Sequence, residues 1–183
     1  MMQKICSKST NAKMILNVAK RMQSSNTWID QAADLRYNSR NVENADDRVR
    51  HFLYQGEKPL SAWHDIPLRP EGADLDIFNG VIEIERATTM KMEVETTMQG
   101  NPIVQDQKKD KATGELKLRH YALKTLFNYG QIPQTWENSQ EKDSVTDCFG
   151  DNDPLDVVDL TDRNMPLFCM PKLKILGCGC LID

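Results

Sequence analysis

The chain has 183 residues, of which 39% are hydrophobic and 27% charged, and its formal net charge is -4. These values indicate one globular domain of ordinary size and exclude a disordered or collagen-like chain. The acidic excess argues against a nucleic-acid binder, and no apolar run approaches the roughly 20 residues that cross a bilayer. We therefore expect neither a nucleic acid nor a membrane as a partner.

The first segment in chain order, residues 1–28, is basic and amphipathic. It contains five cationic residues and no acid: Lys4, Lys8, Lys13, Lys20 and Arg21. Such a sequence is typical of a mitochondrial presequence, and the alternative is a plain basic tail on a cytoplasmic protein. We interpret residues 1–50 as a leader and linker and residues 51–183 as the folded domain.

From His51 onward, short β-rich segments alternate with turns rich in Gly, Asn and Pro. These segments are 51–55, 80–85, 91–98, 116–123 and 172–182. No long stretch outside the leader has helical periodicity. The pattern predicts a mainly β fold, either a sheet or a small barrel.

The two-residue period of a strand predicts which side chains share a face. Three predicted strands place pairs of charged residues on one face: Lys91 with Glu93, Glu83 with Glu85, and Lys117 with Arg119. Each pair alone is explained by a solvated face over an apolar core. Three faces of this kind together suggest a common charged partner.

The segment GDNDPLDV places Asp151, Asp153 and Asp156 around Pro154. The first two aspartates point the same way in an extended backbone, and a bend at the proline swings the third toward them. Three converging carboxylates suit a hard divalent cation such as Mg²⁺. An EF-hand is excluded because Leu155 stands at its fifth position. A D-x-D metal motif of a nucleotide-sugar transferase and a solvated acidic turn stay open.

GDNDPLDV also resembles the most diagnostic segment of the soluble (family I) inorganic pyrophosphatases of the eukaryotic type. LSAWHDIPL, GNPIVQDQKK, NYGQIPQTWE and KILG are similar to the same family in the same order, so the resemblance covers residues 51–183. It implies a mainly β fold with an OB-type five-stranded barrel and peripheral helices. It also implies Mg²⁺ as cofactor and inorganic pyrophosphate as substrate, and it is compatible with a homodimer.

The resemblance further implies a role for nine residues. The Mg²⁺ ligands would be Asp151, Asp156, Glu93 and Asp183, with Glu83 supporting the site. Lys91, Arg119 and Tyr129 would contact phosphate oxygens, and Asp153 would accept a proton from the attacking water. This set is chemically reasonable because pyrophosphate is a dense polyanion, and its hydrolysis needs both charge neutralisation and an activated water.

The chain departs from the family pattern in four places. Glu85 and Ala87 stand where the family has Pro and Trp, and a His, a Gly and a Tyr of the family are missing around residues 123–125. The segment 108–119 is longer than in the family, which predicts a larger hairpin turn. The sequence ends at Asp183, so we expect the C-terminal strand, helices and later ligands of the family to be missing.

Two classes of function follow from the resemblance and its departures. The first is a Mg²⁺-dependent pyrophosphatase. The second is a catalytically impaired relative that acts as a binding or regulatory subunit. The family pattern favours the first, while the missing ligands predict low activity for this polypeptide by itself.

Overall fold

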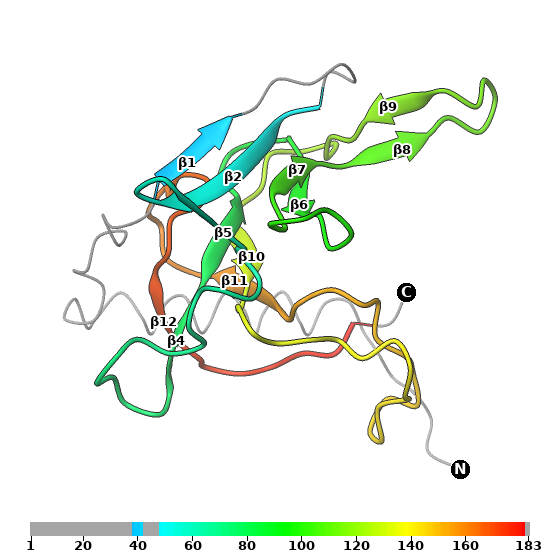
Figure 1. The fold of residues 1–183 in the computed structure, drawn as a ribbon. Coiled ribbons are helices and arrows are strands. Elements are labelled where there is room, and N and C mark those ends of the chain that lie inside the picture. The colour runs from blue at the N-terminus through cyan, green and yellow to red at the C-terminus, as the bar shows by residue number, and fades with distance from the viewer. Residues whose placement is uncertain (1–37, 42–47, 182–183) are drawn as a thin grey trace, which may run out of the picture. The chain divides into compact units, whose positions relative to one another are not determined.

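The computed structural model describes residues 38–41 and 48–181. The predicted presequence and the predicted metal ligand Asp183 lie outside these residues. The described part consists of strands and turns (Figure 1), which confirms the mainly β prediction. The predicted peripheral helices are not found within it, and its connections are interrupted by Gly, Pro, Asn and Asp, which favour turns. No helix of the described residues could span a membrane.

Residues 38–41 and 48–181 contain twelve strands in four antiparallel sheets, and their bounds are as follows. They are β1 (Asn38–Asn41), β2 (Arg50–Gln55), β3 (Lys58–Leu60), β4 (Ile77–Asn79), β5 (Val81–Ile84), β6 (Met92–Val94), β7 (Ile103–Gln105), β8 (Gln107–Lys109), β9 (Leu116–Leu118), β10 (Asn128–Gln131), β11 (Asp156–Asp159) and β12 (Lys172–Lys174).

The largest sheet has the order β1-β2-β7-β6, with β3 paired to the β2 strand. A second sheet has the order β11-β10-β5, and two further pairs are β12-β4 and β8-β9. Strand β1 falls inside the range interpreted as leader and linker, and it pairs with β2 from Asn38 opposite Tyr54 to Asn41 opposite His51.

Burial follows the predicted alternation in the strand that carries Lys91 and Glu93. Met92 and Val94 are buried in the core, whereas Glu93 is only partly buried. The predicted strand 116–123 is shorter than expected. Residues 116–118 form β9, and His120 adds a single antiparallel bridge to Met90. Leu116 and Leu118 stay exposed on a hairpin with β8 that extends away from β6 and β7 (Figure 1).

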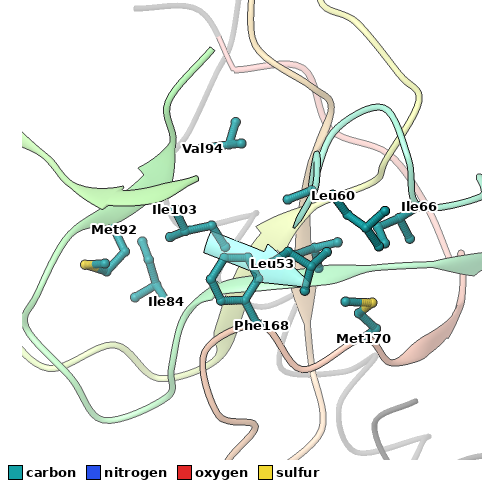
Figure 2. Close-up of a cluster of buried hydrophobic side chains, with 11 residues drawn as sticks. Leu53, Leu60, Ile66, Ile84, Met92, Val94, Ile103, Phe168 and Met170 are labelled. Atoms are coloured by element: carbon teal, nitrogen blue, oxygen red, sulfur yellow. The ribbon is translucent and has the colours of Figure 1, made fainter. Parts of the chain in front are cut away.

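The hydrophobic core lies between the two larger sheets and the segment that precedes β12. Its cluster of buried side chains is drawn in Figure 2 and consists of Leu53, Leu60, Ala62, Ile66, Val81, Ile84, Met92, Val94, Ile103, Phe168 and Met170. Phe168 reaches the core because its backbone N–H donates to the Ile82 carbonyl at 2.8 Å. Burying each large side chain of this kind contributes about 1.5–3 kcal/mol, so the core fixes the strands that carry the polar site.

Candidate active site

A pocket of about 110 Å³ opens between β5, β6, β10 and the aspartate segment before β11. Most of the residues singled out from the sequence line this pocket: Glu83, Lys91, Glu93, Tyr129, Asp151, Asp153 and Asp156. The remaining wall is formed by Ile84, Met92, Val94, Gln131 and Pro154. Arg119 lies off the wall, and Asp183 is outside the described residues.

A β-bulge directs Glu83 into the pocket. On β10, Tyr129 pairs with Ile84 while the next residue, Gly130, pairs with Ile82, so Glu83 is the extra residue of β5. The close approach needs a glycine, because a Cβ at Gly130 would lie 1.9 Å from the Val81 carbonyl oxygen. The bulge therefore buries Glu83 on a strand whose alternation alone suggested a solvated face.

Burial has a strong effect on the Glu83 carboxyl group. Its side chain is 4% exposed, and its Oε1 accepts a hydrogen bond of 3.1 Å from the Val94 N–H. Loss of solvent raises the pKa of Glu83 well above its usual range, and the neighbouring charge of Asp156 raises it further. A nearby cation would favour the ionised form of Glu83 and so lower this pKa again.

Lys91 and Glu93 project from one side of the β6 segment, as the two-residue period predicts. The Lys91 ammonium group donates to the Glu93 carboxylate and to Asp106 Oδ2, the latter at 3.0 Å. Burial lowers the pKa of Lys91, but the hydrogen bonds to the two carboxylates outweigh it, and the net pKa is raised. Lys91 therefore stays charged on the wall of the pocket.

Asp106 connects Arg119 to this pair, although the sequence analysis gave Asp106 no role. Arg119 Nη1 donates to Asp106 Oδ2 at 2.8 Å, the same oxygen that Lys91 contacts. Burial raises the pKa of Asp106, and its two cationic partners lower it to below the usual range. The shared carboxylate holds two cations side by side, an arrangement suited to a polyanionic ligand.

The aspartate segment reaches the pocket through a tight turn. Asn152 has a left-handed backbone with φ of 78°, and the Asp153 N–H donates to Asp151 Oδ1 at 3.0 Å. Asp156 begins β11, where the Tyr129 hydroxyl of β10 hydrogen-bonds its carboxylate. The three aspartates thus converge on one pocket, as the bend at Pro154 suggested.

A neighbouring segment, residues 135–138, holds this turn in place. The Glu137 N–H donates to the Asp153 carbonyl at 2.8 Å, and the Asn152 N–H donates to the Glu137 carbonyl at 3.1 Å. Trp136 Nε1 adds a hydrogen bond of 3.1 Å to Asn152 Oδ1. Gly150 lets these two segments of the chain approach each other, since a Cβ there would lie 2.3 Å from the Glu137 carbonyl carbon.

Crowding of carboxylates dominates the electrostatics of the pocket. Burial, together with the charges of Asp151, Glu93 and Asp156, raises the pKa of Asp153 to about 6. Burial also raises the pKa of Asp156, partly opposed by the hydrogen bond from Tyr129. These carboxylates repel one another, so the pocket favours the binding of a cation.

The donor set fits Mg²⁺ in chemistry. Every candidate ligand on the wall is a carboxylate oxygen, the donor type that Mg²⁺ prefers, and Mg²⁺ commonly uses only one or two carboxylates while keeping several waters. Among residues 38–41 and 48–181, no three His, Cys, Asp or Glu side chains form a ready-made metal cluster. The carboxylate donors therefore suit a cation that keeps part of its hydration shell.

Sequence reasoning missed four residues at or beside this pocket: Asp106, Tyr121, Gln131 and Glu137. Burial first, and then the charge of Asp151, raises the pKa of Glu137. Burial likewise raises the pKa of Tyr121, and the positive charges of Lys91 and Arg119 partly oppose this rise. Asp106, Gln131 and Glu137 lie in segments that resemble the family. That resemblance is the one feature of the sequence that could have identified them.

Comparisons with known proteins agree with this geometry. A model of the inorganic pyrophosphatase family matches residues 80–183. The soluble inorganic pyrophosphatase 6 of Arabidopsis thaliana chloroplasts is 41% identical over 143 residues, which cover 78% of this chain and 44% of the relative. The inorganic pyrophosphatase of Mus musculus is 40% identical over 124 residues, covering 68% and 42%. The chain spans about half the length of the curated relatives it matches.

Solved structures give the same result. A type I inorganic pyrophosphatase from Toxoplasma gondii superposes with a TM-score of 0.67 and 39% identity, covering 77% of this chain and 61% of that one. A Trypanosoma cruzi vacuolar soluble pyrophosphatase, solved in complex with PPi, superposes with a TM-score of 0.61 and 27% identity, covering 84% and 60%. The fold of the described strands is thus similar to that of both proteins.

Proposed function

The chain belongs to the inorganic pyrophosphatase family, and from this premise we propose that it hydrolyses inorganic pyrophosphate to two phosphates with the help of Mg²⁺. One observation carries the proposal. A single pocket is lined by the carboxylates of Glu83, Glu93, Asp151, Asp153 and Asp156 together with the cation Lys91. Such a site is too acidic for bare pyrophosphate and well suited to its complex with a divalent cation.

Substrate binding is assigned to the groups with positive charge or a hydroxyl donor. Lys91 and Arg119 share Asp106 Oδ2, so both cations are already held at one carboxylate oxygen. Phosphate oxygens would compete with Asp106 and Glu93 for these cations and for the Tyr129 hydroxyl. Such prearranged donors lower the barrier of phosphoryl transfer by positioning and charge stabilisation.

Mg²⁺ would be held by Asp151, Asp156 and Glu93, with Glu83 behind them. The chemistry that Mg²⁺ supplies when bound is neutralisation of phosphate charge and activation of water. Glu83 contributes by its fixed orientation, because the Val94 N–H holds its Oε1. Its raised pKa means that the buried carboxylate gains stability when a positive charge enters the pocket.

Asp153 is the proposed general base. In the metal-free chain, burial and the neighbouring carboxylates raise its pKa to about 6, so the group is ionised at neutral pH and more basic than an ordinary aspartate. The hydrogen bond from its own N–H to Asp151 Oδ1 and that from the Glu137 N–H to its carbonyl hold its backbone. In this arrangement Asp153 can receive the proton of the attacking water without moving the turn.

The proposal includes the finer fold prediction, an OB-type five-stranded barrel. It is supported by the contact between β5 of the three-stranded sheet and β6 of the five-stranded sheet. This contact brings Glu83 of β5 near Glu93 of β6, and the proposed metal site uses both carboxylates.

The test is phosphate release from pyrophosphate as Mg²⁺ is varied. The unsubstituted chain is expected to release phosphate only with Mg²⁺, and Asp156→Asn is expected to need a higher Mg²⁺ concentration. Asp162→Asn, at an exposed aspartate outside the pocket, serves as the control. Binding of Mg²⁺ and pyrophosphate without any release would favour the second function, a catalytically impaired binding or regulatory subunit.

A further inference from the structure

Gln131 carries a buried amide oxygen that has no hydrogen-bond partner in the described part of the chain. The residue is 1% exposed, and its Nε2 donates to the Ala62 carbonyl at 3.2 Å. That bond fixes the orientation of the amide, because a carbonyl oxygen needs a donor and only the NH₂ end of the amide can supply one. A buried acceptor left unpaired costs free energy, so its partner is expected to come from outside the chain.

The strand register places Gln131 on the wall of the carboxylate pocket. β10 lies between β5 and β11 (Figure 1), and Gln131 stands directly opposite Asp156 in the antiparallel pairing. Opposed residues of two such strands project from the same face of the sheet. Tyr129, two residues earlier, shares this face, and Gln131 itself lines the pocket.

No donor on the described pocket wall pairs with this amide oxygen. The Tyr129 hydroxyl hydrogen-bonds Asp156, and the Lys91 ammonium group donates to Glu93 and Asp106. The other polar groups on the wall are carboxylates, which accept hydrogen bonds when ionised. The missing donor for Gln131 is therefore expected to be a small species that enters the pocket.

A hydrated divalent cation supplies such a donor, since its waters are polarised and amide oxygens are common partners of hard cations. We propose that Gln131 Oε1 accepts a hydrogen bond from a water of the cation held in this pocket. The inference rests on the proposed function, because it takes the pocket to bind that cation. A neutral oxygen strengthens binding without adding to the repulsion among the carboxylates, and it orients the hydration shell beside Asp156.

The inference is tested by calorimetric titration of Mg²⁺ into the full chain without pyrophosphate. Gln131→Met keeps the length of the side chain and removes the acceptor, and it is expected to weaken Mg²⁺ binding about tenfold. The matched control is Gln134→Met. Gln134 Nε2 also donates to a backbone carbonyl, that of His64 at 3.1 Å, but Gln134 is exposed and lies off the pocket wall. Mg²⁺ affinity is expected to stay unchanged in the control.

Equal Mg²⁺ affinity of folded Gln131→Met and the unsubstituted chain would overturn this inference and leave the proposed function standing. No Mg²⁺ binding by the unsubstituted chain would overturn both. A measurement without substitution covers the case in which Gln131→Met does not fold. The side-chain amide NMR signals of Gln131 are expected to shift on addition of Mg²⁺ while those of Gln134 stay in place, and unmoved Gln131 signals would contradict the inference.

Discussion

Replacing Asp153 by asparagine is expected to stabilise the metal-free chain at pH 8 and to change its stability little at pH 4. Burial, Asp151, Glu93 and Asp156 raise the pKa of Asp153 from 3.8 to about 6. The folded chain therefore holds this proton more tightly than the unfolded chain does. Below pH 3.8 the ionisation of Asp153 does not change the free energy of unfolding. That free energy falls as the pH rises from 3.8 to about 6, and the loss stays constant at higher pH.

The size of this cost follows from the same two pKa values. An interval from 3.8 to about 6 corresponds to about 3 kcal/mol at 1.36 kcal/mol per pKa unit. Asp153 is only partly buried, so solvent screens part of the repulsion and we expect about 1–2 kcal/mol. Asparagine has nearly the same shape and keeps the backbone hydrogen bonds of residue 153, so little of the gain should be lost to strain.

The assay is urea unfolding in EDTA at both pH values, with Asp162→Asn as the exposed control. Asp153→Asn should raise the free energy of unfolding at pH 8 and by much less at pH 4, while the control should change little at either pH. An Asp153→Asn chain that is no more stable than the unsubstituted chain at pH 8 would refute the reasoning. So would an equal gain at both pH values.

Three other substitutions test the supports of the pocket. Gly150→Ala should destabilise the chain by about 1–3 kcal/mol in urea unfolding, because the new Cβ would collide with the backbone of Glu137. Trp136→Phe removes the donor to Asn152 and should cost about 0.5–1.5 kcal/mol of stability, with weaker Mg²⁺ binding in calorimetry. Leu53→Ala should cost about 2–5 kcal/mol in thermal unfolding, since Leu53 is 1% exposed and leaves a cavity. Unchanged stability in any of the three would contradict the packing described.

Local patterns predicted the strand that carries Lys91 and Glu93. Its two-residue period describes a surface with one apolar and one polar face, and Met92 and Val94 are buried as that period requires. The convergence of the aspartates was also visible, because it depends on the short-range effect of Pro154 on the turn.

Long-range features could not be obtained in this way. The burial of Glu83 depends on a bulge that forms only when β5 pairs with β10, and no pattern within residues 80–85 encodes that register shift. The carboxylate shared by Lys91 and Arg119 likewise requires Asp106 from another segment. Gln131 has no local signature either, since its missing partner becomes evident only once the strand is buried.

The most direct test of the central claim compares phosphate release by the unsubstituted chain and by Asp153→Asn at saturating Mg²⁺ and pyrophosphate. The unsubstituted chain is expected to release phosphate in a Mg²⁺-dependent manner, even where the absolute rate is low. Asp153→Asn is expected to release it at least about 100-fold more slowly, because it lacks the base, while still binding Mg²⁺. Equal rates of the two chains, or release by the unsubstituted chain that does not need Mg²⁺, would contradict the account.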